Sequence, residues 1–234
     1  MVFNAHRLSR QNRYGDFLDN DVQAFGAQPI KPTLDRCKEI VPQTQPNLIL
    51  INAGSSDCFQ PQHWGSALIY VKMHELIDYL FEASPRATII MSTVITSPWE
   101  NVEACVKSTN AQIRQVAHDV IREGKPVVLA EMHHDQGLPN RVEEKHIGKD
   151  KMHPIDEGYF IMGDIFIEAI REVDEKGFLK PPVNNGIPFD GEAERHAEET
   201  KSDKQVQEKP PEAEVKKEEE KKPEEKPARR RRHW

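Results

Sequence analysis

Hydrophobic residues of this chain gather in short runs that alternate with longer stretches of helical periodicity. Leu48–Ile51 is four apolar residues in a row between Pro46 and Gly54. It is too short for a helix and typical of a strand buried on both faces. Residues 88–94, where β-branched side chains dominate, and residues 127–130 show the same pattern. These runs predict three strands of a parallel sheet.

The stretches between and after these runs predict helices. In residues 66–81 and 102–121, apolar residues recur at spacings of three and four, which gives one apolar stripe to each helix. Gly124 is placed to end the second of these helices. A shorter helix is predicted over residues 33–40, between Pro32 and Pro42, and a closing helix over residues 155–173. Alternating strands and helices imply right-handed crossovers, and therefore an α/β three-layer sandwich with helices on both faces of the sheet.

The C-terminal segment differs in composition from the rest of the chain. From about Gly191 it is dominated by Glu, Lys and Pro and has almost no large apolar residue. Such a segment cannot bury enough surface to offset its ordering entropy. We therefore expect a folded domain over residues 1–185 and a disordered tail over residues 186–234. The tail ends in four arginines, which could bind an anionic partner weakly or be solvated charge only: Arg229, Arg230, Arg231 and Arg232.

The charge of the predicted domain argues against nucleic acid as a partner. Thirteen acidic and thirteen basic residues lie from Gly191 to Trp234, so residues 1–190 carry the whole net charge of −7. A body of this sign is a poor nonspecific binder of nucleic acid.

The cysteines and the apolar runs give little information on the compartment. Cys37, Cys58 and Cys105 are widely spaced and odd in number, which favours free thiols in a reducing compartment or in a core. No apolar run reaches the ~18 residues of a membrane span. Residues 1–7 have no apolar core of a signal peptide. The compartment stays open.

The candidate chemistry begins with Asp150-Lys151-Met152-His153-Pro154. In a tight loop, a carboxylate three residues before a histidine can accept a hydrogen bond from one imidazole nitrogen. The other nitrogen then faces outward as a general base. The alternative is an Asp and a His on a polar turn with no chemistry.

A second stretch, Gly54-Ser55-Ser56-Asp57, directly follows a predicted strand. Ligands of α/β sheets sit beyond the carboxyl ends of the strands, and the Asp150–His153 loop follows another strand of the same sheet. Acyl transfer can use two such groups at one edge of the sheet: a small-residue turn, which holds the oxyanion, and a histidine supported by an aspartate. His133-His134-Asp135 lacks a third ligand at a suitable spacing, so we expect a polar loop there, and neither a metal nor a cofactor.

These residues resemble the SGNH, or GDSL, hydrolases, in particular fungal GDSL-type esterases of the carbohydrate-esterase sort. Gly54-Ser55-Ser56-Asp57 is similar to the family's Gly-Thr-Asn-Asp block, and Asp150 to Pro154 to its catalytic Asp-x-x-His-Pro, followed by its usual Gly-Tyr as Gly158-Tyr159. A weaker likeness begins at Asp19-Asn20-Asp21-Val22. The resemblance implies the flavodoxin-like SGNH fold, with Asp150 and His153 as catalytic residues.

The chain departs from the family pattern at three places. The family's nucleophile is the serine of a Gly-Asp-Ser turn after the first strand, and no Gly-Asp-Ser occurs in these 234 residues. We therefore expect a domain whose first strand and nucleophile are missing at the N-terminus. The resemblance also implies a degenerate oxyanion hole, in which Gly26 stands one position from the expected glycine and Ser56 replaces an asparagine.

Two functions remain open. The first is an SGNH-type esterase that acts on a small ester or an acetylated carbohydrate and is inactive as given because it lacks the nucleophile. The second is a degenerate SGNH domain that binds a ligand or a protein partner without catalysis.

Overall fold

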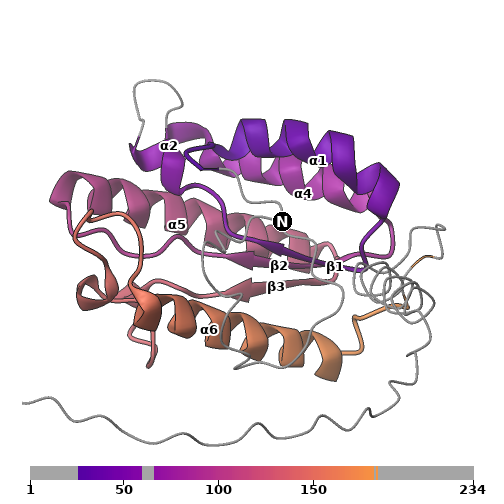
Figure 1. The fold of residues 1–234 in the computed structure, drawn as a ribbon. Coiled ribbons are helices and arrows are strands. Elements are labelled where there is room, and N and C mark those ends of the chain that lie inside the picture. The colour runs from indigo at the N-terminus through magenta and orange to yellow at the C-terminus, as the bar shows by residue number, and fades with distance from the viewer. Residues whose placement is uncertain (1–25, 60–65, 182, 184–234) are drawn as a thin grey trace, which may run out of the picture. The chain divides into compact units, whose positions relative to one another are not determined.

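The computed structural model describes residues 26–59, 66–181 and 183. Within them, three parallel strands pair in chain order: β1 (Leu48–Ile51), β2 (Thr88–Ser92) and β3 (Val127–Ala130). Leu50 lies beside Ile90 in the register, and Ile90 lies beside Val128. Figure 1 shows the three strands side by side. The parallel sheet predicted from the apolar runs is confirmed.

Helices cover both faces of this sheet. α1 (Ile30–Thr44), α4 (Ile69–Ala83) and α5 (Glu100–Arg122) lie on one face (Figure 1). α6 (Asp156–Glu175) lies on the other face and contacts β2 and β3. The three-layer α/β sandwich is therefore confirmed.

Side chains of the strands alternate between the two layers. Ile49 and Met91 belong to the apolar cluster under α1, α4 and α5. Ile90 and Val128 belong to the cluster under α6. All five residues of β2 are buried. A central parallel strand that is buried on both faces has no solvent-facing side, which is why three apolar residues, Ile89 to Met91, follow one another at its centre.

The first helix is longer than the prolines predict. α1 includes Pro32 in its first turn, where backbone N–H groups have no helical partner, and Pro42 in its last turn. Pro42 cannot donate to the carbonyl of Lys38 four residues earlier. The Tyr79 hydroxyl of α4 donates to that carbonyl instead, at 3.5 Å. The helix continues past Pro42 to Thr44 and ends at Gln45, which has a left-handed conformation (φ 44°) and donates its N–H to the carbonyl of Val41.

The second strand is shorter than the predicted residues 88–94. The Asn110 side chain of α5 accepts from the backbone N–H of Val94 at 2.7 Å and donates to its carbonyl at 2.9 Å. The amide of Asn110 therefore takes the groups that would extend the ladder, and the pairing stops at Ser92.

The remaining predicted elements are close to their expected bounds. The helix predicted over residues 66–81 is a 3₁₀ turn, Ser66–Leu68, followed by α4. Gly124 follows α5 with a positive φ of 77°, as a helix-ending glycine does. No helix of the described segments has the length and apolarity to cross a membrane. The predicted tail with Arg229 to Arg232 and the segment at Asp19 lie outside the described residues.

Candidate active site

Three chain segments meet at the edge of the sheet where its strands end. They are the residues that follow β1, β2 and β3, and parallel pairing places all three at the same edge (Figure 1). The segment after β1 begins with Gly54, and the segment after β3 contains Asp150 and His153. This is the edge where α/β folds place their ligands.

Asp150 and His153 lie on a tight hairpin just before α6. The N–H of Ile155 donates to the carbonyl of His146, and the N–H of Gly148 donates to the carbonyl of His153, both at 2.8 Å. Lys151 occupies the turn with a positive φ of 58°. These two short backbone hydrogen bonds fix the conformation of the hairpin that carries Asp150 and His153.

The Asp150 carboxylate binds the turn and the imidazole together. Oδ1 accepts from the backbone N–H groups of Met152 and His153, each at 3.0 Å. Oδ2 lies 2.7 Å from Nδ1 of His153. The bond from the His153 N–H, followed by that from its imidazole and that from the Met152 N–H, lowers the pKa of Asp150 from 3.8 to about 2. The hydrogen bond that the spacing predicts is present.

The imidazole of His153 keeps one nitrogen for chemistry. With Asp150 accepting at Nδ1, the neutral ring carries its proton there and Nε2 has a free lone pair. Among the described residues Nε2 makes no hydrogen bond, and the side chain is 53 % exposed. A base in this state can accept a proton from a hydroxyl that approaches from solvent.

Gly158 allows α6 to pack closely against the hairpin. A Cβ at this position would lie 2.8 Å from the carbonyl oxygen of His146 and 2.8 Å from Cβ of Pro154. Only glycine permits that approach without a shift of backbone. Tyr159, the next residue, is half-buried, and burial followed by the Asp150 charge raises its pKa. Gly158 thus determines how closely α6 packs against the hairpin.

The turn after β1 is a short helix, α2 (Ser55–Phe59), instead of a loop. Gly54 enters it with a φ of 115°, and a Cβ there would lie 3.3 Å from Cγ2 of Thr109. Ser56 lies in the first turn of α2 and is half-buried. Gly26 lies in an exposed turn before α1, where a Cβ would meet nothing within 4 Å. Their predicted part in an oxyanion hole stays a prediction.

Asp57, the last residue of the matched block, is a structural residue. It is fully buried and accepts from the backbone N–H of Ile30 at 3.0 Å and from Nζ of Lys72 at 2.9 Å. The carboxylate therefore ties α2 to the start of α1 and to α4.

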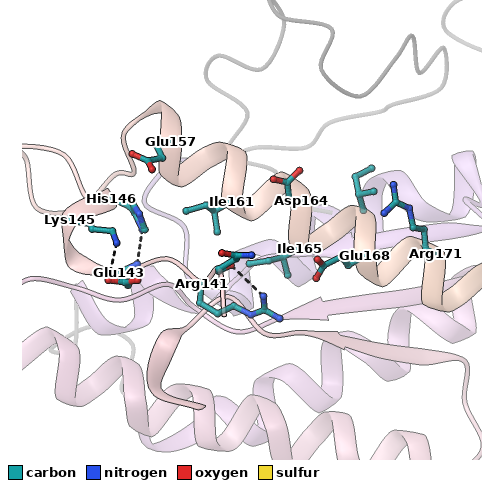
Figure 2. Close-up of a pocket in the computed structure, with 12 residues that line it drawn as sticks. Arg141, Glu143, Lys145, His146, Glu157, Ile161, Asp164, Ile165, Glu168 and Arg171 are labelled. Carbon is teal, nitrogen blue, oxygen red and sulfur yellow. Dashed lines mark hydrogen bonds and ion pairs between the residues drawn. The ribbon is translucent and has the colours of Figure 1, made fainter. Parts of the chain in front are cut away.

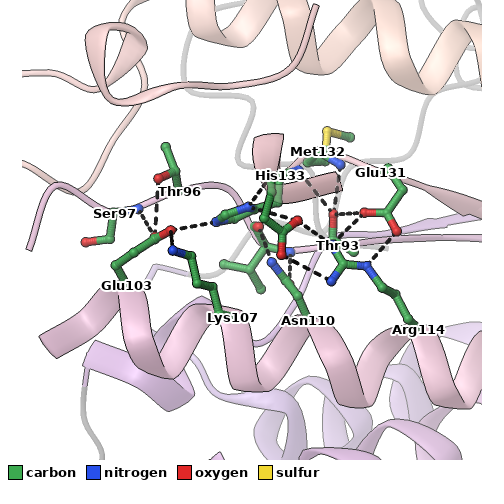
Figure 3. Close-up of polar contacts among 12 residues, drawn as sticks. Thr93, Thr96, Ser97, Glu103, Lys107, Asn110, Arg114, Glu131, Met132 and His133 are labelled. Carbon is green, nitrogen blue, oxygen red and sulfur yellow. Dashed lines mark hydrogen bonds and ion pairs between the residues drawn. The ribbon is translucent and has the colours of Figure 1, made fainter. Parts of the chain in front are cut away.

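The polar loop predicted at His133-His134-Asp135 contains a short 3₁₀ turn, His134–Gln136, and its first histidine, His133, is fully buried. Its Nδ1 accepts from the backbone N–H of Asp135 at 3.0 Å, so its Nε2 carries the proton and lies 2.9 Å from Oε1 of Glu103 (Figure 3). The backbone N–H of Ser97 donates to Oε2 of Glu103 at 2.8 Å. The His133–Glu103 pair thus joins the segments after β2 and β3 to α5.

A second group of contacts extends this network along α5. Arg114 contacts Glu131 at 2.7 Å and Asp135 at 2.7 Å. Burial raises the pKa of Asp135, but the hydrogen bonds and the charge of the Arg114 guanidinium outweigh it and hold the pKa below 3.8. Glu103, Asn110 and Arg114 recur at helical spacing, and that polar face of α5 was the signal available in the sequence. No three potential metal ligands converge in the described parts of the chain.

The prediction of three free thiols is wrong. Cys58 of α2 and Cys105 of α5 form a disulfide, with their Cα atoms 5.6 Å apart. Cys37 is free and buried. Because the two half-cystines are 47 residues apart in sequence, only the packing of α2 against α5 shows that they meet.

Comparison of the whole fold with solved structures gives consistent matches. A carbohydrate esterase family 3 protein from Talaromyces cellulolyticus is 20 % identical with a TM-score of 0.57, over 66 % of this chain and 72 % of its own. A family 3 carbohydrate esterase from Clostridium thermocellum is 18 % identical with a TM-score of 0.55, over 66 % and 71 %. This chain has the SGNH hydrolase fold.

A GDSL-like lipase from Bacteroides thetaiotaomicron has the same SGNH fold, with 23 % identity and a TM-score of 0.50 over 64 % of this chain and 75 % of its own. No protein-family model and no curated protein matches the sequence. At these identities the likeness concerns the fold. The SGNH fold expected from the sequence motifs is confirmed, while the roles of Asp150, His153, Gly26 and Ser56 remain predictions.

Proposed function

We propose that the carboxyl edge of the sheet is the site of an SGNH-type ester hydrolase, with His153 as general base and Asp150 as its orienting carboxylate. The observation that carries this proposal is the 2.7 Å contact between Oδ2 of Asp150 and Nδ1 of His153. It selects the tautomer whose Nε2 can take a proton from a hydroxyl nucleophile and later return it to the leaving alcohol.

The charge of Asp150 supports this role. A carboxyl whose pKa is about 2 stays ionised at any pH at which an ester hydrolase would work. The imidazolium that forms on proton transfer then faces a fixed negative charge at Nδ1. That arrangement favours the charged state of the base in the transition state and keeps the ring oriented.

The oxyanion side of the site is proposed to be weak. Ser56 follows β1 at the same edge and is partly accessible, but its hydroxyl reaches less far than the asparagine amide it replaces in the family pattern. Gly26 would supply a backbone N–H. Loss of one good oxyanion donor typically costs about 10²–10³ in rate.

The proposed substrate class is an acetyl ester of a carbohydrate. Two of the matched structures are carbohydrate esterases by description, and their fold is shared over 66 % of this chain. The exposed position of His153 fits a substrate that approaches the rim from solvent, as a sugar ester does.

The family's nucleophile is the serine of a Gly-Asp-Ser turn, and that sequence does not occur in these 234 residues. Among the described residues, no serine or threonine hydroxyl donates to Nε2 of His153. We therefore propose that the chain as given does not turn over esters. This favours, as the second candidate, a non-catalytic SGNH domain that binds its ligand at the same edge.

The experiment compares aryl acetate hydrolysis by the 234-residue chain with that of its His153→Ala variant. Equal rates, at the level of the buffer, are expected because none of the residues that the structure describes places a hydroxyl within about 3 Å of the base to be deprotonated. A burst of nitrophenol from the chain that His153→Ala abolishes would contradict this and indicate a substitute nucleophile among the serines present.

A further inference from the structure

Trp99 is an exposed aromatic residue at the edge of the sheet where the strands end. Its side chain is 38 % exposed, and no other Phe, Tyr or Trp that the structure describes is exposed to this degree. It directly precedes α5, in the segment that follows β2 (Figure 1). Apolar surface in contact with water costs roughly 25 cal/mol per Å². An indole at this edge therefore gains free energy when a ligand covers it.

The backbone of Trp99 is held by the polar contacts at the start of α5. Its N–H donates to Oγ of Ser97 at 3.3 Å, and its carbonyl accepts from the N–H of Glu103 at 2.7 Å. Ser97 is buried, and its own N–H donates to the Glu103 carboxylate, which pairs with His133 (Figure 3). The indole is thus carried by a turn that is bonded on both sides of the residue.

The ring of Trp99 packs against Phe59. The two ring centroids are 5.9 Å apart and the planes are inclined at 71°, which is an edge-to-face contact. Phe59 is the last residue of α2 and packs against the apolar cluster under α1, α4 and α5. The pair therefore joins the segments that follow β1 and β2. A side chain that is already oriented loses little conformational entropy when it binds a ligand.

The residues next to the indole are polar. Glu100 and Asn101 are exposed and begin α5 directly after Trp99. They supply hydrogen-bond acceptors and an amide donor, and the indole N–H is a further donor. A purely apolar ligand would leave these groups unused. A sugar unit has a face of C–H groups that stacks on the electron-rich face of an aromatic ring, and its hydroxyls can bond to the polar groups around that ring.

The aromatic pair is separate from the cavity between α6 and the loop that precedes the Asp150–His153 hairpin. Ile161 and Ile165 line that cavity, whereas neither Phe59 nor Trp99 does (Figure 2). The indole instead lies on open surface. Open surface suits one unit of a chain-like ligand, because the neighbouring units can extend along the edge of the sheet.

We propose that Trp99, oriented by Phe59, stacks against one sugar unit of a carbohydrate chain whose acetyl ester lies at His153. Glu100 and Asn101 bind hydroxyls of the unit at Trp99. This unit is not the one that reacts, so Trp99 determines the affinity for the carbohydrate and takes no part in the chemistry of the ester. The inference rests on the carbohydrate ester proposed above as the substrate class.

The test is an NMR titration of the 234-residue chain with two unesterified trisaccharides, xylotriose and cellotriose, and with hexanol. The chain has three tryptophans, and the indole N–H signal that Trp99→Phe removes is that of Trp99. One of the trisaccharides at least is expected to shift this signal. Hexanol should bind at least about tenfold more weakly, because it has too few hydroxyls for the polar groups. No probe is an ester, so hydrolysis of aryl acetates without trisaccharide binding would refute the role of Trp99 and leave the hydrolase standing.

Trp99→Leu keeps an apolar side chain but removes the ring, and should weaken trisaccharide binding by about tenfold or more, with a smaller loss in Trp99→Phe. The control is Ile121→Ala at the other end of α5, 47 % exposed, which should leave binding unchanged. Should Trp99→Leu fail to fold, Phe59→Leu supplies a second variant, expected to weaken binding because the indole loses its support. Three results would overturn the proposal: no binding of either trisaccharide, equal binding of hexanol, or unchanged affinity in a folded Trp99→Leu chain.

Discussion

The Asp150 side chain shows how a few hydrogen bonds can organise an exposed site. One carboxylate accepts two backbone N–H groups of its own turn and the imidazole of His153. The backbone bonds fix the carboxylate, and the carboxylate then fixes the ring. The geometry of the candidate base is therefore local and does not depend on the distant core.

The first prediction concerns the pKa of Asp150, which should be about 2 by NMR titration of its carboxyl carbon. Because the folded pKa lies below the ordinary 3.8, the carboxylate stabilises the fold above pH 3.8 and loses this contribution as the pH falls through about 2. In His153→Ala the backbone N–H remains, so the pKa should rise only partly. A return to 3.8 in this variant would contradict the hydrogen bonds described.

The second prediction concerns Gly158, whose replacement by alanine should destabilise the protein by about 1–3 kcal/mol because the new Cβ has no room. Chemical denaturation measures the change. Gly26→Ala is the matched control, since a Cβ there meets nothing within 4 Å. Equal stabilities of the two variants would show that α6 does not pack against the hairpin as closely as the structure has it.

At the residue scale, sequence patterns predict what is local. The three-residue spacing of Asp150 and His153 predicts their hydrogen bond, because both groups lie in one turn. His133 is different, since its partner Glu103 is 30 residues away on α5. Nothing near His133 in the sequence distinguishes a loop histidine from a buried one.

At the scale of elements, Asp57 connects three helices through one buried carboxylate. It belongs to α2, bonds to the first residue of α1 and pairs with Lys72 of α4. Because β1 leads directly into α2, the position of the candidate oxyanion turn depends on this contact.

The third prediction follows from that pair. Asp57→Asn keeps an acceptor for Ile30 but removes the buried charge that pairs with Lys72 at 2.9 Å, and should cost about 3 kcal/mol of stability. Asp78→Asn is the control, because Asp78 is 50 % exposed and its pairing with Lys125 should be worth about 1 kcal/mol or less. Denaturant melts of both variants measure the loss of stability in each. Similar small losses would mean that Asp57 does not hold the helices together.

The fourth prediction concerns the link between α2 and α5. Thiol titration of the unfolded, unreduced protein should find Cys37 only, because Cys58 and Cys105 are joined. Reduction should destabilise the protein by about 4 kcal/mol, since the bridge closes a loop of 47 residues. Three titratable thiols in protein that was never exposed to reductant would contradict the disulfide.

The elements themselves are largely predictable from hydrophobic periodicity, whereas their ends are not. Leu48–Ile51 and Val127–Ala130 have the bounds that their apolar runs predict. The Lys38 carbonyl that Pro42 leaves free in α1 contacts the Tyr79 hydroxyl, and the Asn110 amide bonds to the backbone of Val94 beyond the end of β2. Both are tertiary contacts from other helices, which a local pattern does not contain.

At the scale of the whole molecule, the fold and the activity rest on different residues. The layers of the fold pack through apolar runs in which different apolar side chains of suitable size can replace one another. The fold can therefore match an esterase structure at 20 % sequence identity. The proposed catalysis needs a hydroxyl beside His153, and no serine or threonine of the described residues donates to its Nε2. The same structure is therefore compatible with an enzyme or a binding domain, and the hydroxyl distinguishes them.

The most direct test supplies that hydroxyl. The chain is extended at its amino end by a strand that ends in Gly-Asp-Ser, and aryl acetate hydrolysis is measured with and without His153→Ala. We expect the folded, extended chain to hydrolyse the ester and His153→Ala to lower its kcat by about 10²–10⁴. An extended chain that folds but has no activity, or whose activity does not change in His153→Ala, would contradict the role of the Asp150–His153 pair.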